Sequence, residues 1–262
     1  MVKQTQPVRA LCICREKIAR CRHPSEMIFA NASAIRLSGD SPPFIASMIR
    51  ALVFDFDGLI LDTETPWVDA YADVHALYGV AFNRDLFIRS VGHVDCPFDP
   101  WNGFGENSDR SELDNEMRFY KQIRVLAQPV LPGVVSMMDT ARTKGLSVAL
   151  ASNSPHVHCN RHLQRIGLLD RFHFVGCRED VALPKPEPDL YRLAVDRLGL
   201  KPQEAIAFED SHAGSLAAKR AGLWCVAVPN PSSAHHDFDH VDLRVNSMAD
   251  LTLDALIARF SR

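Results

Sequence analysis

Two aspartates at the end of one apolar run are the residues that most clearly indicate chemistry in this sequence. The stretch LVFDFDGLILDTE spans residues 52–64, so Asp55 and Asp57 follow the run directly and Gly58 comes next. Side chains two residues apart on a strand project to the same side. Two neighbouring carboxylates repel each other unless a positive group lies beside them. The spacing therefore predicts a neighbouring cation, and Gly58 permits the tight turn that such a site needs.

Polar side chains also follow the other predicted strands. Ser152 and Asn153 come after LSVALA, and Glu209 and Asp210 end the strand EAIAFED. Lys185 lies in the loop LPKPEPD, which follows a short extended segment. In an open parallel sheet, ligands bind beyond the carboxyl ends of the strands. We therefore expect these side chains to meet the two aspartates at one mouth of the sheet.

The acidic residues of this set predict a magnesium site. Mg²⁺ prefers oxygen ligands and keeps several of its waters. We expect Asp55 and Asp210 to supply carboxylates, with Glu209 binding directly or through a water. Asp57 is not needed as a carboxylate ligand and stays available for proton transfer.

The remaining groups predict a phosphate site. Lys185 can hold one phosphoryl oxygen, and Ser152 can donate to another. A helix predicted to begin near Asn153 would add its amino-terminal N–H groups, which form a natural anion site. Metal ion, lysine and helix end together suit a phosphoryl group whose charge must be neutralised.

The two aspartates can then divide the reaction. Asp55, ionised beside the metal ion, can attack phosphorus and form an aspartyl phosphate. Asp57 can protonate the leaving oxygen and then deprotonate the water that resolves the intermediate. The predicted function is a magnesium-dependent phosphatase acting on a small phosphorylated metabolite, such as a sugar phosphate.

Four segments resemble, in order, the signature motifs of the haloacid dehalogenase superfamily. They read DFDGLILDTE, LASNS, PKPEPD and FEDSHAGSLAAKRAG, and the resemblance covers residues 48–262. It points to the phosphoglycolate phosphatase and β-phosphoglucomutase-like subgroup, which carries a helical cap after the first motif. The resemblance implies a Rossmann-like core, Mg²⁺, and a metal ligand from the backbone carbonyl of Asp57. The side chains that it implies for the site are Asp55, Asp57, Ser152, Lys185, Glu209 and Asp210.

The order of the predicted elements indicates an α/β fold. From Ile49 onward, buried strands alternate with helices, which is typical of a Rossmann-like, doubly wound parallel sheet. Residues 65–130 break the alternation with mainly helical patterns, and we predict an inserted α-helical cap there. The core then comprises residues 48–64 and 131–262.

An irregular piece of the insertion carries the candidates for substrate recognition. His93, Trp101 and Arg110 lie in or near HVDCPFDPWNGFGEN. Loops of this kind are where selectivity resides on a common fold. Packing within the insertion is the alternative interpretation for Trp101.

Two groups of histidines are predicted to lie on the surface. His158 and His162 are four residues apart on a predicted helix. That spacing could serve a metal ion, but we interpret the pair as part of a solvated face. The segment AHHDFDH, residues 234–240, is interpreted as a surface loop.

Composition narrows the remaining classes. The 262 residues carry a formal charge of −3, which does not favour a nucleic-acid partner. No apolar run approaches the roughly 18 residues that span a bilayer, so no membrane partner is expected. Seven scattered cysteines suit reduced thiols, and a zinc knuckle around His23 would need an uncommon spacing. We expect a cytoplasmic monomer.

Residues 1–47 differ from the rest of the chain. They are basic, weakly periodic and contain the breaker cluster SGDSPPF. A transit peptide is one interpretation. We favour a disordered leader, or a start codon assigned too far upstream, because Met48 directly precedes the first strand.

A phosphomutase of the β-phosphoglucomutase type is the alternative function. Such an enzyme holds a second phosphate, in part through a lysine soon after the serine of the second motif. Pro155 occupies that position here and brings neither charge nor N–H, although Arg84, Arg89 or Arg110 could compensate. The complete acidic set disfavours a non-catalytic protein and a dehalogenase. A phosphonatase would need a Schiff-base lysine, and Lys121, in a charged helix, is a poor candidate.

Overall fold

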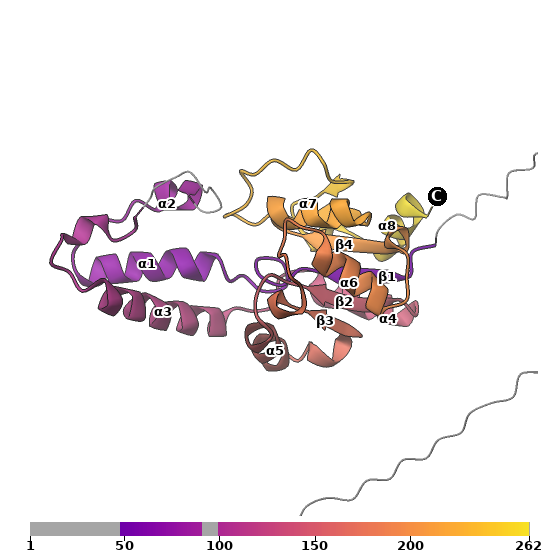
Figure 1. Ribbon diagram of the computed structural model, residues 1–262, viewed down its shortest axis with the longest axis horizontal. Coiled ribbons are helices and arrows are strands. Elements are labelled where there is room, and N and C mark those ends of the chain that lie inside the picture. Colours follow the sequence, from indigo (N-terminus) through magenta and orange to yellow (C-terminus); the bar gives the residue numbers. More distant parts are fainter. Residues whose placement is uncertain (1–47, 91–98, 262) are drawn as a thin grey trace, which may run out of the picture. The chain divides into compact units, whose positions relative to one another are not determined.

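A six-stranded parallel sheet forms the centre of the structure. The computed structural model describes residues 48–90 and 99–261. The strands lie in the order β3-β2-β1-β4-β5-β6, and each neighbouring pair is parallel (Figure 1). The doubly wound α/β prediction is confirmed. The bounds are β1 Ala51–Phe54, β2 Ser147–Ala151, β3 Phe174–Gly176, β4 Ala205–Glu209, β5 Trp224–Ala227 and β6 Leu243–Arg244, the last too short to have been predicted.

Helices follow the strands and also form the insertion. The sheet is flanked by α4 Val134–Thr143, α5 His156–Arg165, α6 Asp189–Arg197, α7 His212–Ala221 and α8 Leu253–Phe260. The insertion contains α1 Thr65–Leu77, α2 Arg84–Ser90 and α3 Arg110–Ala127. Short 3-10 turns cover Asn102–Phe104, Leu169–Arg171, Arg178–Asp180, Pro202–Glu204 and Met248–Asp250. Within the described ranges, none of the helices has the length and apolarity needed to cross a membrane.

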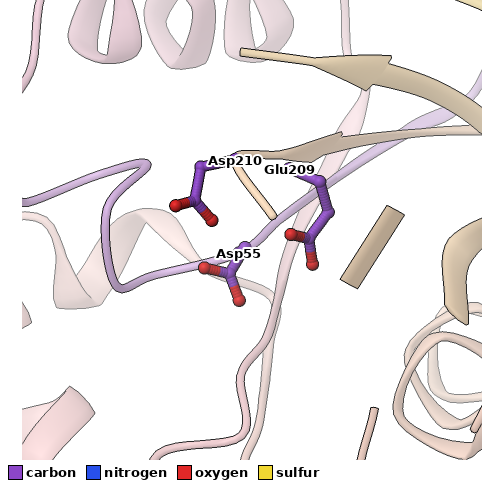
Figure 2. A group of neighbouring side chains, drawn as sticks. All are labelled: Asp55, Glu209 and Asp210. Atoms are coloured by element: carbon purple, nitrogen blue, oxygen red, sulfur yellow. The ribbon is translucent and has the colours of Figure 1, made fainter. Parts of the chain in front are cut away.

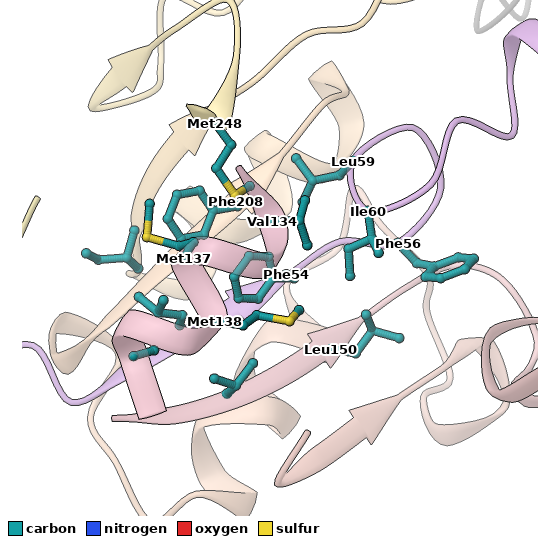
Figure 3. Close-up of a cluster of buried hydrophobic side chains, with 14 of the residues drawn as sticks. Phe54, Phe56, Leu59, Ile60, Val134, Met137, Met138, Leu150, Phe208 and Met248 are labelled. Carbon is teal, nitrogen blue, oxygen red and sulfur yellow. The ribbon is translucent and has the colours of Figure 1, made fainter. Parts of the chain in front are cut away.

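Alternation along β1 divides the core into two clusters. Leu52 and Phe54 belong to one face of the sheet, where they pack with residues of α4 such as Val134 (Figure 3). Ala51 and Val53 belong to the opposite cluster, which includes residues of α6 and α7. These four residues of β1 are fully buried. Because β1 also pairs with a strand on each side, the residues that follow it start from a rigid position.

Helix α7 has a clear local signal at each of its ends. Ser211 precedes it, and the Ser211 hydroxyl accepts from the N–H of Gly214 at 3.1 Å, which is an amino-terminal cap. Gly222 ends it with a φ of 89°, in the left-handed region that glycine adopts at little cost. The position of α7 directly after β4 is therefore set by its own sequence.

The insertion has an apolar cluster of its own. Helices α1 and α3 run side by side (Figure 1), with Tyr71 of α1 and Leu113 of α3 among the buried residues. Arg124 of α3 donates to both carboxylate oxygens of Asp73 of α1, at 2.6 and 2.8 Å. The extent of the insertion as a cap, residues 65–130, stays a prediction.

Candidate active site

Three buried carboxylates lie together at the carboxyl ends of β1 and β4 (Figure 2). Phe54 of β1 is in register with Phe208 of β4, so the next residues, Asp55 and Glu209, lie side by side at the end of the two strands. Asp210 follows at once. One oxygen from each carboxylate lies within 4.8 Å of the others. The strand-end reasoning therefore predicted this grouping correctly.

Lys185 is the cation that lies beside Asp55, between the carboxylates of Asp55 and Glu209. Its ammonium donates to Asp55 Oδ1 at 2.6 Å and to Glu209 Oε1 at 2.5 Å, and its side chain is only 4% exposed. Burial lowers the pKa of Lys185, but the two carboxylates outweigh burial and hold the pKa above its ordinary value. Lys185 stays charged, and a phosphoryl contact from the same ammonium stays a prediction.

The negative charge of the three carboxylates nevertheless exceeds the positive charge of Lys185 beside them. Burial raises the pKa of Asp55 to about 8, with Lys185 opposing the rise and Glu209 adding to it. Burial, followed by the charges of Asp55 and Glu209, raises the pKa of Asp210 well above its ordinary value. Three acids against one lysine leave two negative charges unmatched, which fits a divalent cation bound through oxygen.

The hydrogen bonds of Glu209 distinguish it from the two aspartates. Its Oε1 accepts from Lys185 and from the hydroxyl of Tyr191 at 2.6 Å, and its Oε2 accepts from the hydroxyl of Ser211 at 3.1 Å. Because both of its oxygens already accept hydrogen bonds, Glu209 fits binding of a metal ion through a water better than direct binding. Asp55 and Asp210 are the carboxylates best placed to hold a metal ion. Tyr191 was not predicted, because a helical tyrosine carries no sign of its partner.

Asp57 is held by groups that the sequence did not assign to it. Ser154 donates its hydroxyl to Asp57 Oδ2 at 2.5 Å, and His158 Nε2 lies 2.9 Å from Asp57 Oδ1. Burial would raise the pKa of Asp57, but the hydrogen bond and charge of His158, with the Ser154 hydroxyl, outweigh burial and lower the pKa. The prediction that His158 lies on a solvated face is therefore wrong, since α5 places its side chain against Asp57.

The prediction of a solvated face is also wrong for His162. It is 7% exposed and packs against Phe56 and His158, with ring centroids 6.3 and 4.8 Å away. Burial, the charges of His158 and the nearby arginines lower the pKa of His162 to about 4. His162 is therefore a neutral, packed side chain and not a solvated one.

The predicted phosphate groups lie at the site but in a changed arrangement. Helix α5 begins at His156 and not near Asn153, and the first N–H donates to the carboxylate of Glu179 at 3.1 Å. The Asn153 amide pairs with the backbone N–H and C=O of Lys185 at 2.9 and 3.1 Å, so its side chain positions the lysine loop. Ser152 is buried and accepts from the N–H of Ser154 at 3.0 Å. Phosphate binding by Ser152 and Asn153 stays a prediction.

Two glycines permit the close approach of these segments. Gly58 has a φ of 82°, and a Cβ there would overlap Asn230 and Asp210. A Cβ on Gly214 would overlap the carboxylate of Glu209. Asn230 donates to Asp210 Oδ2 at 2.7 Å. Asn230 follows the fifth strand, so the rule that identified the other strand-end residues could have identified it too.

A cavity of about 900 Å³ opens over the carboxylates. Asp55, Asp57, Ser152, Lys185 and Asp210 line it. Further lining residues come from the loop before α1, from α3, from α5 and from the loop after β5, and they include Glu64, Lys121, His158, Asn230, Ser232, Ser233, His235, His236 and Asp237. The segment at residues 234–240 is a loop as predicted, but two of its histidines, His235 and His236, line this cavity.

The structure describes two of the three candidates for substrate recognition in the insertion, Trp101 and Arg110. Trp101 is 4% exposed, donates to Asp114 at 2.9 Å and stacks on His75, so it packs inside the insertion. Arg110 is exposed and pairs with Asp99 at 2.6 Å. Neither residue lines the cavity. His93 lies outside the described residues.

Comparison with known proteins gives this arrangement a family. The sequence profile of the haloacid dehalogenase-like hydrolases matches residues 49–222. The chain is 38% identical to YhcW of Bacillus subtilis and 32% identical to hexitol phosphatase B of Escherichia coli K12, each over 80% of this chain and 97% of the relative. It is 28% identical to β-phosphoglucomutase of Bacillus subtilis, over 79% of this chain and 94% of that enzyme.

A solved structure agrees with this grouping. CbbY from Rhodobacter sphaeroides in complex with phosphate superposes with a TM-score of 0.60 at 25% identity, over 80% of this chain and 99% of that chain. The fold and the acidic site are those of a haloacid dehalogenase-like hydrolase, and the chain belongs to that family. Its relatives place it in the phosphoglycolate phosphatase and β-phosphoglucomutase-like subgroup, as the four motifs predicted.

Proposed function

We propose that this chain is a magnesium-dependent phosphatase that hydrolyses the phosphate ester of a small sugar or sugar alcohol through an aspartyl phosphate. The chain is a phosphoric monoester hydrolase by family and by its relatives. The observation that carries the finer proposal is the buried cluster of Asp55, Glu209 and Asp210 around Lys185 at the base of the cavity. The substrate class follows the name of hexitol phosphatase B.

Mg²⁺ would be held by the carboxylates of Asp55 and Asp210, with the backbone carbonyl of Asp57, while Glu209 orients Lys185. When bound, the ion would supply the positive charge that favours an ionised Asp55 and stabilises charge on the phosphoryl oxygens. Lys185 already lies 2.6 Å from Asp55 Oδ1. An ammonium at that place can stabilise the negative charge of the carboxylate and then, as the new bond forms, the negative charge on the phosphoryl oxygens.

The reaction divides into two displacements at phosphorus. In the first, an Asp55 oxygen forms a bond to phosphorus as the ester oxygen leaves with a proton from Asp57. In the second, a water oxygen attacks phosphorus, its proton passes to Asp57, and the bond to Asp55 breaks. Inorganic phosphate and an alcohol are released, and both aspartates return to their starting states.

Hydrolysis fits the cavity better than a mutase reaction. A bis-phosphorylated intermediate needs cations for its distal phosphate. Arg84 pairs with Asp69 at 2.5 Å and Arg110 with Asp99, and within the described ranges neither these arginines nor Arg89 line the cavity. Pro155 adds no charge at the edge of the cavity. The arginines that could have compensated for it therefore do not line the cavity.

A metabolite screen tests the proposal. The protein is incubated with Mg²⁺ and a panel of hexose, pentose and hexitol phosphates, and inorganic phosphate is measured. We expect release of phosphate from a subset of the panel, with no isomerisation when a sugar bisphosphate is added. Quantitative conversion of a sugar 1-phosphate into its 6-phosphate, with negligible free phosphate, would establish the mutase instead.

A further inference from the structure

Both oxygens of the Asp57 carboxylate have a partner on the segment that opens α5. Oδ2 accepts from the hydroxyl of Ser154 at 2.5 Å, and Oδ1 lies 2.9 Å from His158 Nε2. Two contacts on two oxygens restrict the rotation of the carboxylate about its side-chain bonds. The orientation of Asp57 is thus determined by residues about 100 positions away in the sequence.

The imidazole of His158 is itself held in place. Phe56, the residue between the two catalytic aspartates, meets the ring edge-on with centroids 5.6 Å apart. His162 lies one helical turn further along, at 4.8 Å. Phe56 is fully buried in the main core cluster, whereas His158 lines the cavity. The packed core therefore fixes the ring that orients Asp57, and one edge of that ring faces the substrate space.

On the basis of the proposed function, we propose that His158 is a positioning residue for acid–base catalysis, which holds Asp57 at the angle needed to protonate the leaving oxygen. A neutral imidazole has one N–H donor and one acceptor nitrogen. In one tautomer Nε2 of His158 can donate to Asp57 as a carboxylate, and in the other tautomer the same nitrogen can accept from Asp57 as a carboxylic acid. The Ser154 hydroxyl has the same capacity.

The proton balance leaves His158 unchanged over the whole cycle. The Asp57 acid gives its proton to the ester oxygen as the bond from that oxygen to phosphorus breaks. The Asp57 carboxylate later takes a proton from the attacking water. His158 contributes geometry to both steps, because a proton moves only over a short, well-directed hydrogen bond.

The dependence on the leaving group separates this role from a merely structural one. A sugar alkoxide is a poor leaving group and needs the proton from Asp57, whereas p-nitrophenolate leaves without one. The parameter kcat/KM covers the steps up to departure of the leaving group, so it reports the first displacement alone. Loss of orientation at Asp57 should lower kcat/KM for the sugar phosphate and leave that for p-nitrophenyl phosphate nearly unchanged.

The test compares three substitutions in the full chain with Mg²⁺. His158→Phe keeps the ring against Phe56 and removes both nitrogens, and His158→Leu serves if the first variant does not fold. His158→Gln keeps an N–H donor near the place of Nε2. His156→Phe is the matched control, because His156 lies on the same helix but contacts Asp180, at 2.7 Å.

General acid–base catalysis supplies roughly 10²–10⁴-fold in rate, so we expect His158→Phe to lower kcat/KM for the sugar phosphate about 10- to 100-fold. The value for p-nitrophenyl phosphate should stay within about threefold, as should both values for His158→Gln and His156→Phe. Equal losses on the two esters, no loss on either, or an equal loss in His158→Gln would overturn the positioning role. A wild-type chain that hydrolyses neither ester would instead defeat the proposed function itself.

Discussion

Asp55 is the residue at which the demands of the reaction and of the fold conflict most directly. The proposed role as nucleophile requires an ionised Asp55, yet burial raises the pKa of its carboxyl group to about 8 and Glu209 adds to the rise. Lys185 offsets part of this effect through its contact at 2.6 Å. The residue is therefore prepared for a second positive charge before any substrate arrives.

Asp55→Asn should abolish turnover and preserve the fold. An amide is a poor nucleophile and a poor Mg²⁺ ligand, so we expect kcat to fall by roughly 10³-fold or more. Phosphate release and thermal unfolding measure the two effects. Asp196→Asn, at an exposed position of α6, is the control that should behave as wild type. Phosphate release from Asp55→Asn at the wild-type rate would rule out the aspartyl phosphate.

Asp210→Asn should change the response of stability to Mg²⁺. Occupancy at 100-fold over Kd adds about 2.7 kcal/mol to the free energy of unfolding, or roughly 5–10 °C in Tm for a chain of this size. We expect that rise in the wild type and little or none in Asp210→Asn. Without Mg²⁺ the variant should unfold at a higher temperature than the wild type, because one of three mutually repelling carboxylates is gone. An equal Mg²⁺ shift in both proteins would remove Asp210 from the metal site.

His162 should make the fold sensitive to acid. The pKa of His162 is about 4 in the folded protein, against 6.5 for an ordinary histidine. The unfolded chain thus binds a proton more readily, so stability is complete above pH 6.5 and falls as pH drops toward 4. The loss reaches about 3 kcal/mol, at roughly 1.4 kcal/mol per pKa unit. Urea unfolding of wild type and His162→Leu at pH 7.5 and 5 should show a smaller pH difference in the variant. Equal pH differences would contradict this account.

At the scale of the element, the sequence predicted which side chains meet at the strand ends, but not what the side chains on a helix face contact. Asp55, Asp57, Glu209 and Asp210 each follow a strand with a clear apolar signature, and the ends of parallel strands meet at one edge. His158 sits on a helix with a mixed face, and nothing in that pattern says what lies across from it. Only the packing of α5 against the Asp57 loop determines its partner.

The start of α7 should tolerate no side chain at its third residue. Gly214 passes so close to Glu209 that a Cβ would overlap the carboxylate. Gly214→Ala should lower the free energy of unfolding by about 1–3 kcal/mol, since overcrowding outweighs the helix propensity of alanine. It should also lower kcat, because Glu209 orients Lys185. The control is Gly103→Ala, whose Cβ would meet only the end of the Val80 side chain. Urea unfolding and phosphate release give both readouts, and full activity in Gly214→Ala would contradict the close contact.

At the scale of the molecule, the sheet and its helical insertion were predictable from the sequence, but the lining of the cavity was not. The order of the predicted strands and helices predicted a doubly wound sheet with a helical insertion. The lining of the cavity by Lys121 and by the loop at residues 230–237 depends on how distant segments pack, which no local pattern reports. Trp101 illustrates the limit, because a tryptophan in an irregular segment looks the same whether it meets a substrate or the interior of the insertion.

A chain that begins at Met48 should fold and retain its activity. Residues 1–47 lie outside the described residues, whereas both core clusters and the carboxylates of Asp55, Glu209 and Asp210 lie within them. The family profile also starts at residue 49. We expect the same Tm, within about 2 °C, and the same kcat/KM for the shortened chain as for the full one, a change of well under 1 kcal/mol. Insoluble or inactive shortened protein would show that the first 47 residues take part in the fold.

The central position of β1 also has a consequence for the order of events during synthesis. β1 emerges first from the ribosome, but its neighbours β2 and β4 follow only after the whole insertion and much of the remaining chain. Lys185 lies 130 residues after Asp55, and Glu209 a further 24. A nascent chain therefore carries β1 without both of its neighbouring strands until β4 has been made. The carboxylates of Asp55, Glu209 and Asp210 come together only after β4 has been made, so an interrupted chain lacks part of the proposed metal site.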